Sequence, residues 1–419
     1  MSVPSTGLRY FTNPISITSQ FPFCGLPLRL DTYAGCAFRC SYCFARYRAE
    51  ATFGTDHVRP ANPETIRRVF RFALDLARFP DGVVAQCLRR RMPIHFGGMS
   101  DGFQPAEQKH RVTEAALRVL AQYQYPTVIS TRGMLVAESP YIDLLKDIGA
   151  VVVQFSFSTA KDSIAKIVEP HATPPSLLLQ TMETLAAKGI TVTCRWQPYI
   201  PGVSEEPSEF VSRVVSAGAR HLALEHLKLA VERQHPLWRQ LTQSVGRDPY
   251  DEFTKRGMRR DGREYVLLPE AKLNTIIETA RLVRLHGASF GSADNEFQYL
   301  SDSACCCSGV DQFPGFENWF KHQIGYAVRQ SRGKKKITYG SIAREWIPGG
   351  SVDWYVNPTS RLSARLGRKA TMRDHIKAKW DSLVAPGSPS SFYGVRCIPS
   401  SKDCERTYLW DIPAHSGEG

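Results

Sequence analysis

Three cysteines in the segment GCAFRCSYCFARY (35–47) have the spacing of a metal-binding loop. Cys36, Cys40 and Cys43 follow the pattern C-x-x-x-C-x-x-C directly after a predicted strand. A four-iron, four-sulfur cluster normally takes four thiolates, so three thiolates from one loop leave one iron open to an exogenous ligand. A structural zinc ion would need a fourth ligand, which this loop does not supply. The loop therefore favours an iron-sulfur cluster with an open iron, and zinc is the alternative.

The elements that must position this loop alternate between short β-rich runs and amphipathic helical patterns from about residue 28 onward. Such alternation is typical of βα units on a parallel sheet. Because βαβ crossovers are right-handed, six units curl into a barrel whose ligand sites lie on the loops after the strands. We expect an α/β fold, a partial (β/α)6 TIM-like barrel with a smaller basic C-terminal α+β module. The predicted strands are residues 28–33, 92–97, 125–131, 150–158, 190–197 and 221–228.

Changes in composition along the chain suggest its domain organisation. We predict an N-terminal extension at 1–27, the barrel at 28–328 with an insertion at about 229–268, and a C-terminal module at 329–419. The net charge is +13, and between Arg329 and Lys379 thirteen Lys or Arg residues stand against three Asp or Glu. Basic residues interleaved with Trp and Tyr suit phosphate contacts and base stacking, and a solvated helical surface is the alternative. We expect the module to bind nucleic acid.

The composition, with 42% hydrophobic and 22% charged residues, is typical of a folded soluble protein. The sequence contains no run of about 18 apolar residues, and its first twenty residues lack the pattern of a signal peptide. We therefore expect a cytoplasmic protein with no membrane partner. Because that compartment keeps thiols reduced, the clustered cysteines among the eleven in the chain indicate metal ligands or reactive groups rather than disulfides.

The cysteine loop resembles that of the radical S-adenosylmethionine superfamily, in which an aromatic residue usually precedes the last cysteine, as Tyr42 does here. The resemblance implies that the open iron of the cluster binds S-adenosylmethionine and that electron transfer breaks its sulfonium. The resulting 5′-deoxyadenosyl radical abstracts hydrogen from a substrate. An electron donor such as flavodoxin or ferredoxin is then an expected partner. The protein's own task is to position and shield the radical.

Further segments are similar to the spore photoproduct lyase-like branch of that superfamily, often labelled DNA repair photolyases. They are HFGGMSDGFQPAE (95–107), FSFST (155–159), EPHATPP (169–175) and PYIPG (198–202), and the similarity spans about residues 28–230. The branch places a glycine motif for the cofactor's methionine moiety after the second strand, where Gly97 and Gly98 stand. The resemblance implies cofactor contacts by Tyr42, Gly97, Gly98, Ser100, Asp101, Ser156, Ser158 and Arg195.

One position departs from that branch. Spore photoproduct lyase carries a hydrogen-donating cysteine just before the Ser-Asp pair, and the matching position here is Gly98, so repair by the same route is not expected. Three adjacent thiols in SADNEFQYLSDSACCCSG (292–309) could replace it. They could donate hydrogen, bind zinc, ligate a second iron-sulfur cluster with a partner such as Cys24, Cys397 or Cys404, or be a buried apolar trio. We assign catalytic roles to Cys305, Cys306, Cys307 and Asp294.

The combined interpretation is a radical S-adenosylmethionine enzyme acting on a nucleic-acid base or base lesion, DNA rather than RNA, in repair or modification. A radical methyltransferase or tailoring enzyme acting on RNA, protein or a small metabolite is a second hypothesis. The third hypothesis is a zinc-dependent nucleic-acid-binding protein with no enzymatic activity. Metal content and the products formed from S-adenosylmethionine distinguish the three.

Overall fold

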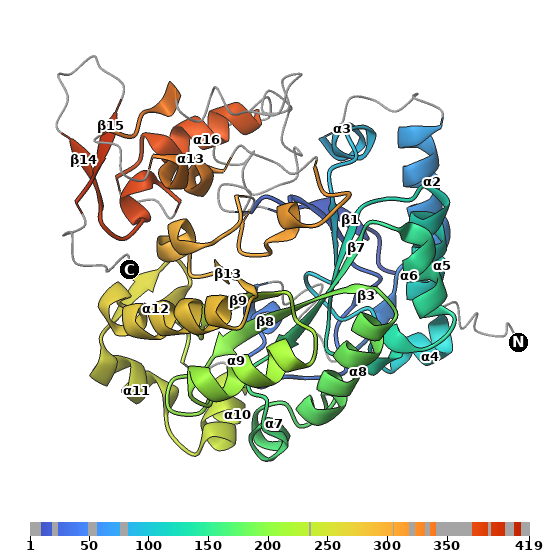
Figure 1. The fold of residues 1–419 in the computed structure, drawn as a ribbon, viewed down its shortest axis with the longest axis horizontal. Helices are drawn as coiled ribbons and strands as arrows, with labels where there is room; N and C mark the ends of the chain where they lie inside the picture. Colours follow the sequence, from blue (N-terminus) through green and yellow to red (C-terminus); the bar gives the residue numbers. More distant parts are fainter. Residues whose placement is uncertain are drawn as a thin grey trace, which may run out of the picture.

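The core of the fold is an eight-stranded sheet with the order β1-β2-β5-β6-β7-β8-β9-β13 (Figure 1). Seven of these strands are parallel to their neighbours, and β1 pairs with β2 in the antiparallel direction. The expected partial barrel of parallel βα units is confirmed. The strands are β1 (Ile15–Ile17), β2 (Leu28–Leu30), β5 (Ile94–Phe96), β6 (Thr127–Thr131), β7 (Val151–Phe157), β8 (Thr191–Tyr199), β9 (His221–His226) and β13 (Ser289–Ser292).

The computed structural model describes most, but not all, of the chain. The described residues are 10–18, 24–48, 57–75, 83–233, 236–304, 306–317, 323–331, 336–340, 371–383, 387–398 and 406–411. Cys305 and residues 341–370, which carry many of the basic side chains noted above, lie outside them.

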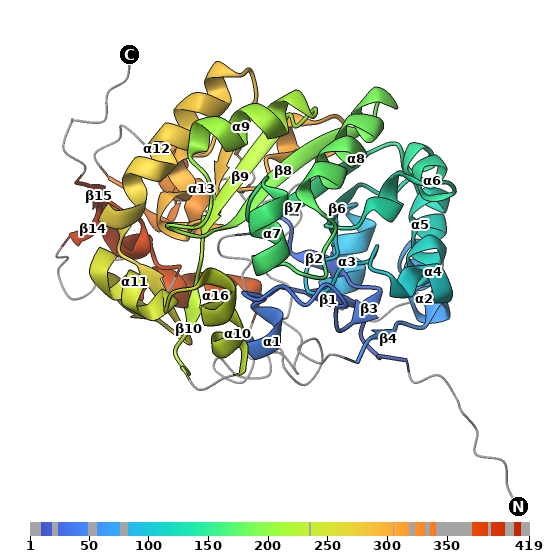
Figure 2. The same cartoon turned by 90° about the horizontal axis from the view of Figure 1, so that it is seen from below.

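Helices cover the outer face of the sheet because each follows a strand and buries one apolar side. In α5, for example, Val112, Ala116, Leu117 and Leu120 share one helix face and are buried in the main core. Figure 2 shows α9 and α12 side by side over the strands β8 and β9. The helices are α2 (Pro63–Leu74), α3 (Val83–Arg89), α4 (Ala106–His110), α5 (Val112–Gln122), α6 (Tyr141–Ile148), α7 (Asp162–Val168), α8 (Pro175–Ala187), α9 (Pro207–Ser216) and α12 (Pro269–Leu285).

The parallel strands present two different environments. Leu28, Leu30 and Ile94 face the helices and have no exposed surface. Arg29 and His95, which alternate with them, keep part of their surface exposed although they lie in the middle of β2 and β5. Since alternate residues of a strand point to opposite faces, the inner face of the barrel is polar and accessible.

Apolar side chains fill the end of the barrel at which the parallel strands begin. We term this the inner end of the barrel. Val128 and Val152, near the starts of β6 and β7, pack against a group that we term the barrel plug. The segment that follows β13 therefore returns to the bottom of the barrel. The plug consists of Leu26, Cys306, Val310, Phe313, Phe316 and Tyr326, with Cys24 and Ala304 packed against it.

The segment predicted as an insertion forms elements outside the main sheet. Strands β10 (Leu229–Ala230), β11 (Met258–Asp261) and β12 (Glu264–Leu267) form a separate antiparallel sheet. Helices α10 (Pro236–Val245) and α11 (Pro249–Arg256) accompany it, and an apolar cluster around Leu229 and Phe253 joins them to α7.

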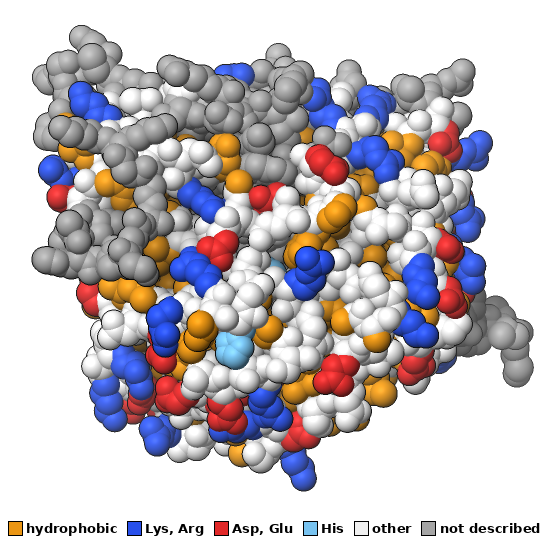
Figure 3. All heavy atoms as spheres, in the orientation of Figure 1, with side chains coloured by type: hydrophobic (Ala, Val, Ile, Leu, Met, Phe, Trp, Pro, Cys, Tyr) orange, Lys and Arg blue, Asp and Glu red, His pale blue; other side chains and the backbone are white. Residues whose placement is uncertain are grey.

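The described C-terminal elements are α13 (Ile324–Gln330), α16 (Met372–Trp380), β14 (Val395–Ile398) and β15 (Thr407–Trp410). The strands β14 and β15 form an antiparallel pair, and Trp380 of α16 packs edge-on against Tyr408 of β15. In Figure 1 these elements lie together beyond β13. On the face shown in Figure 3, Lys and Arg side chains are interspersed with Asp and Glu over the described residues.

Candidate active site

The cysteine loop begins after β3 (Tyr33–Ala34) and ends in the short helix α1 (Ala45–Arg48). It turns tightly, because the N–H of Cys43 donates to the carbonyl of Cys40 at 3.2 Å. The N–H of Ser41 donates to the carbonyl of Val168 at 3.1 Å, which fixes the loop to the end of α7. Cys40 is buried, whereas Cys36 and Cys43 are partly exposed. The loop thus presents its thiols on the side of the barrel where the strands end.

The three thiols lie within electrostatic reach of one another. Burial raises the pKa of Cys36 to about 12, and it also raises the pKa values of Cys40 and Cys43. Backbone N–H groups of Phe38 and Asp101 act in the opposite direction at Cys36, as does Arg132 at Cys40. The protein therefore offers donors that stabilise thiolates, but the thiols stay protonated until a metal displaces the protons.

A buried glutamine joins the cysteine loop to the glycine loop that follows β5. Gln104 Oε1 accepts a hydrogen bond from the N–H of Ala37 at 2.8 Å. Its Nε2 donates to the carbonyls of Gly35 at 3.2 Å and Asp101 at 3.0 Å. Gln104 has no exposed surface, so all three bonds are shielded from water. The two loops are therefore fixed relative to each other by one side chain.

The glycine loop has its own anchors. Gly97 has a φ of +82°, and a Cβ there would lie 2.5 Å from the carbonyl oxygen of Ser130, so only glycine fits. Asp31 Oδ1 accepts from the N–H of Met99 at 2.8 Å and of Ser100 at 3.3 Å. Burial raises the pKa of Asp31 to about 6. Ser100, expected at the cofactor, donates its hydroxyl to the carbonyl of Tyr33 at 2.5 Å.

Asp101, also expected at the cofactor, holds the loops at the ends of β5 and β6. Its Oδ1 accepts from Thr131 Oγ1 and from the N–H of Phe103, both at 2.8 Å. Its Oδ2 accepts from the N–H of Arg132 at 2.6 Å. These bonds orient the loop that carries Gln104, and the backbone of Asp101 contributes to the surroundings of Cys36.

A buried ion pair beside the cysteines was not anticipated from the sequence. Arg132 Nη1 lies 2.6 Å from Glu169 Oε2, and both side chains are almost completely buried. Tyr42 and Ser158 donate their hydroxyls to Glu169 Oε1, the latter at 2.5 Å. Burial raises the pKa of Tyr42, so its phenol remains a donor. The motif EPHATPP supplied the only sequence signal for Glu169, and it identified no partner.

Ser156 and Arg195 are register partners on the neighbouring strands β7 and β8. Both keep part of their surface exposed on the inner face of the barrel. Arg195 Nε is buried and has no hydrogen-bond partner within the part of the chain that the structure describes. The structure therefore brings Ser156 and Arg195 together inside the barrel, whereas Ser158 lies at the Glu169 network near Tyr42.

Cys306 and Cys307 lie at the inner end of the barrel, and Cys305 is outside the described residues. Cys306 contacts both Cys24 and Cys307 through side-chain hydrogen bonds, and its Sγ lies 3.1 Å from Ser308 Oγ. The Cys306 contact is the largest of the causes that raise the pKa values of Cys24 and Cys307, and burial adds to it. The thiols are thus grouped with one another and apart from the cysteine loop.

Asp294 is completely buried between β9 and α12. Its Oδ2 lies 2.7 Å from His226 Nδ1, and its Oδ1 accepts from Lys272 Nζ at 3.0 Å. Burial raises the pKa of Asp294, but the charges of Lys272 and His226 outweigh it and hold the pKa well below its usual range. Lys272 also donates to Glu296 at 2.7 Å. These bonds are those of a structural ion network.

Among the described residues, no group of three or more His, Cys, Asp or Glu side chains converges on a single metal ion. An iron-sulfur cluster attaches each thiolate to a different iron, so its ligands need not converge in this way. A second metal site at the cysteine trio is not supported by the described residues. None of the described helices is both long and apolar enough to span a bilayer.

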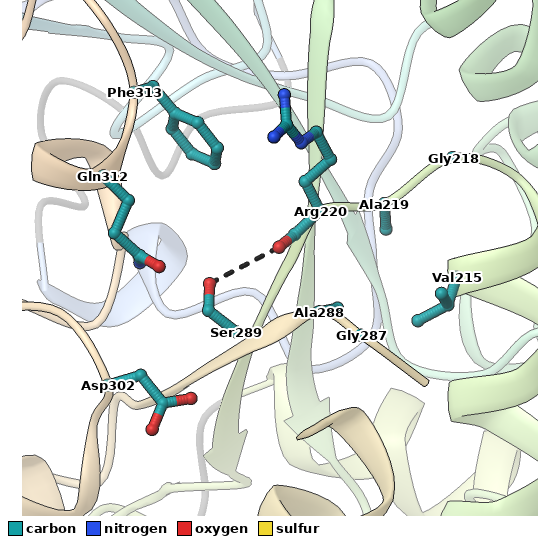
Figure 4. A pocket seen from close by; sticks show the side chains of 10 residues that line it. All are labelled: Val215, Gly218, Ala219, Arg220, Gly287, Ala288, Ser289, Asp302, Gln312 and Phe313. Carbon is teal, nitrogen blue, oxygen red and sulfur yellow. Dashed lines mark hydrogen bonds between the residues drawn. The ribbon is translucent and has the colours of Figure 1, made fainter. Parts of the chain in front are cut away.

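A hollow of about 510 Å³ lies at the opposite end of the barrel from the cysteine loop. Figure 4 shows Arg220, Ser289, Asp302 and Phe313 around it. Arg220 directly precedes β9, and Ser289 is the first residue of β13. The Arg220 guanidinium stands over the Phe313 ring at 5.7 Å, and Ser289 Oγ donates to the Arg220 carbonyl at 3.4 Å. None of the residues expected at the cofactor lines it.

Curated relatives of the chain are themselves uncharacterized. A protein of Mycobacterium tuberculosis is 25% identical over 217 residues, covering 49% of this chain and 60% of that protein. A protein of Methanocaldococcus jannaschii is 19% identical over 176 residues, covering 41% of this chain and 60% of that protein. The chain thus spans about 60% of the length of the relatives it matches.

Similar solved structures include a spore photoproduct lyase mutant, with a TM-score of 0.49 and 16% identity over 67% of this chain and 79% of that one. A complex of spore photoproduct lyase with dinucleoside spore photoproduct gives a TM-score of 0.47 and 15% identity, covering 68% and 79%. Residues 30–214 match the family model described as "Radical SAM superfamily", a range that includes the cysteine loop, the glycine loop and the Glu169 network. This part of the chain is a radical S-adenosylmethionine domain.

Proposed function

We propose that the protein is a radical S-adenosylmethionine enzyme whose Cys36, Cys40 and Cys43 hold a four-iron, four-sulfur cluster. The observation that carries this proposal is the cysteine loop of a radical S-adenosylmethionine domain, with three neighbouring thiols fixed by Gln104 to a glycine loop. When bound, the cluster and S-adenosylmethionine supply a 5′-deoxyadenosyl radical that abstracts hydrogen from a substrate.

The residues present fit such a cluster. Three thiols on one loop leave an open coordination position, and the backbone N–H groups of Phe38 and Asp101 near Cys36 lower the cost of a thiolate. The Arg132 guanidinium lies close enough to Cys40 and Cys43 to offset negative charge there. Glu169 holds Arg132 in place through their ion pair. Negative charge on the loop is thus balanced by fixed protein groups rather than by water.

The cofactor contacts that we propose follow the family resemblance except at Arg195. Gly97 and Gly98 leave room for backbone contact with the methionine moiety, and Ser156 offers a hydroxyl on the inner face. Arg195, for which the resemblance implies a cofactor contact, lies beside Ser156, and we assign it to the substrate rather than to the cofactor. Ser100, Asp101 and Ser158 donate or accept within the protein, so we assign them to shaping the cofactor pocket. Tyr42 is fixed by Glu169 beside the cysteines.

The substrate that we propose is a nucleic-acid base or base lesion, in DNA rather than RNA. Two observations support it, the sequence resemblance to the spore photoproduct lyase-like branch and the positive charge of the C-terminal segment. Spore photoproduct lyase has been solved with a dinucleoside spore photoproduct, which belongs to that protein. A flavodoxin or ferredoxin is the proposed electron donor, and the cytoplasm the proposed location.

We assign Cys306 and Cys307 to hydrogen donation. Cys306 belongs to the barrel plug, and Cys307 contacts Cys306 and interacts with Arg195 on the inner face of the barrel. Burial and the contact with Cys306 keep the thiol of Cys307 protonated, which is the form that can give up a hydrogen atom. Asp294, held by Lys272, acts as a positioning residue for the segment that leads to these thiols.

The test is iron, sulfide and zinc analysis of the anaerobically reconstituted protein, followed by an assay for 5′-deoxyadenosine after reduction. We expect about four irons per chain, by the stoichiometry of the cluster, and formation of the nucleoside. Replacing Cys36, Cys40 and Cys43 by Ala should abolish both results. Cys397→Ala, in β14, is the matched control and should retain both. Zinc without iron or nucleoside would sink the proposal.

A second assay separates the two groups of cysteines. Replacing Cys306 and Cys307 by Ala should preserve cofactor cleavage and impair formation of the final product in the presence of DNA. A labelled methyl group in the product would favour the methyltransferase hypothesis instead. Loss of cleavage in the Cys306 and Cys307 variant would contradict the division of labour.

A further inference from the structure

The inner face of the barrel carries a belt of polar side chains, which we term the interior belt. It is formed by Arg29, His95, Ser130, Gln154, Thr193 and Arg195, from five strands. Arg29, His95, Ser130 and Arg195 keep part of their surface exposed, although each sits within a strand whose neighbouring residues are fully buried or nearly so. Four of the six members of the belt are therefore partly accessible.

Four members of the belt have polar atoms that find no partner among the described residues. These atoms are Arg29 Nε, Gln154 Nε2, Thr193 Oγ1 and Arg195 Nε, and all four are buried. Gln154 is 1% exposed and Thr193 has no exposed surface. Gln154 Oε1 already accepts from Ser130 Oγ at 3.5 Å, which leaves its amide N–H groups as free donors. Buried donors normally find an acceptor, so these groups point to an absent one.

The members of the belt lie close to one another. Arg29 and His95 are register partners, and a Cβ built on Gly98 would lie 3.5 Å from Arg29 Nε and 3.7 Å from His95 Nδ1. His95 Nε2 lies 2.8 Å from Ser130 Oγ, and Gln154 is paired with Ser130 and with Thr193. Arg195 and Arg29 both act electrostatically on His95.

The charge of the belt is positive. Arg29 and Arg195 each contribute a guanidinium group, which carries a positive charge. Burial and these two guanidinium groups lower the pKa of His95 to about 3, which leaves it neutral. Asp31 interacts with Arg29, but its Oδ1 is used by two backbone N–H groups. On the adjacent strand, Glu225 is engaged by Gln197 and Lys228.

From this geometry we infer that the interior belt binds the phosphate group of the substrate, with Arg29 and Arg195 as its charged ligands and Gln154 and Thr193 as neutral donors. The inference rests on the proposed function, because it names the part of a nucleotide substrate that enters the barrel. A buried guanidinium N–H is costly to leave without an acceptor, and a phosphate accepts more hydrogen bonds than a carboxylate.

The position of the belt separates it from the cysteine loop. Arg29 acts on Cys24, and Arg195 acts on Cys307, two of the thiols that meet at Cys306 at the inner end of the barrel. The belt thus lies between the barrel plug and the strand ends that carry the cysteine loop. A phosphate held there would place the attached sugar and base between the thiols and the cofactor loops.

The test uses the full-length protein and inorganic phosphate. Equilibrium dialysis measures phosphate binding, and thermal unfolding at constant ionic strength measures its effect on stability. Phosphate should bind and raise the unfolding temperature above that in chloride, and acetate should do so much less. Arg29→Gln and Arg195→Gln should each weaken phosphate binding at least about tenfold, which is the loss of about 1.4 kcal/mol of interaction. If Arg29→Gln does not fold, phosphate binding is measured on Arg29→Lys instead, which keeps the positive charge.

The matched control is Arg118→Gln on the exposed surface of α5, where Arg118 pairs with Glu114. It should bind phosphate as the unmodified protein does. Equal effects of phosphate, acetate and chloride on the unmodified protein overturn the inference, as does full retention of binding in Arg29→Gln and Arg195→Gln. S-adenosylmethionine should not compete with phosphate. If it does compete, and if Arg29→Gln and Arg195→Gln lose affinity for S-adenosylmethionine to the same extent, the belt binds the cofactor carboxylate and the inference is overturned. Phosphate binding needs no cluster, so failure of the cluster assay is distinguishable from failure here.

Discussion

Arg132 Nη1 and Glu169 Oε2 lie 2.6 Å apart, in a buried ion pair that joins the end of β6 to the segment after α7. The pair is surrounded by two further donors to Glu169, from Tyr42 and Ser158. The cysteine loop is attached at the same place, because Ser41 bonds to the carbonyl of Val168. Four separate segments of the chain therefore meet at one carboxylate.

Glu169→Gln should destabilise the protein by roughly 3 kcal/mol, because it leaves the Arg132 charge buried without a counter-charge. Urea unfolding of the cluster-free protein measures this. Glu209→Gln removes the exposed partner of Lys161 and should change the free energy of unfolding by less than about 0.5 kcal/mol. Equal effects of the two substitutions would show that the buried pair has no special energetic role.

Gly97→Ala should destabilise the glycine loop much more than Gly98→Ala. Gly97 has a positive φ, and an added Cβ would lie 2.5 Å from a backbone oxygen, whereas a Cβ at Gly98 would meet Arg29 at an ordinary 3.5 Å. We expect a loss of roughly 2 kcal/mol or more for Gly97→Ala and about 0.5 kcal/mol or less for Gly98→Ala. Chemical denaturation of both variants compares them directly, and a reversed order would contradict the loop geometry.

Acid should destabilise the folded protein through His95. Its pKa is lowered from 6.5 to about 3 by burial, by Arg195 and by Arg29. As the pH falls below 6.5, the unfolded chain binds a proton that the folded chain does not, so folded-state stability falls toward pH 3 with a slope of up to about 1.4 kcal/mol per pH unit.

The measurement is the free energy of unfolding between pH 4 and 7, on the unmodified protein and on His95→Asn. Asp31, whose pKa is raised to about 6, acts in the opposite direction, since a raised carboxyl pKa favours the folded state as the pH falls. It is present in both proteins, so the difference between the two curves isolates His95. Parallel curves would exclude a neutral His95 in the folded state.

Asp294→Asn should cost roughly 3–5 kcal/mol of stability, because Lys272 and His226 would lose their shared buried carboxylate. The double variant with Lys272→Met should recover part of that loss, since it removes a buried cation that Glu296 alone would then balance. Thermal unfolding and iron content of the reconstituted proteins are the readouts, and we expect the iron content to be unchanged. A stable Asp294→Asn variant that lacks only substrate turnover would instead support direct contact of Asp294 with the substrate.

The sequence predicted the barrel well because its strands carry a local signal. The run AVVVQFSFS (150–158) is rich in β-branched and aromatic residues, and it corresponds to β7 at Val151–Phe157. The strand β1, at Ile15–Ile17, is only three residues long, too short for its β-branched residues to stand out in the sequence, and it pairs with β2 in the antiparallel direction. Local propensity therefore identified the repeated units but not the edge of the sheet.

The candidate site was predictable only where spacing along the chain reflects the chemistry. Cys36, Cys40 and Cys43 are close in sequence, so their pattern is visible without a structure. Arg29 and Arg195 lie on strands that are far apart in the sequence. The family resemblance singled out Arg195, but nothing in the sequence around Arg29 marks it as inward-facing. The Glu169 network likewise depends on contacts between distant segments. Such groups become apparent only when the strands are arranged side by side.

The bonds of Gln104 have a thermodynamic consequence for how the protein acquires its ligands. Since one side chain holds both the cysteine loop and the glycine loop, a ligand that orders either loop reduces the entropy lost when the other is ordered. Such coupling is reciprocal, so the gain in affinity is the same whichever ligand arrives first. We therefore expect the protein without the proposed cluster to bind S-adenosylmethionine more weakly than the protein that contains it.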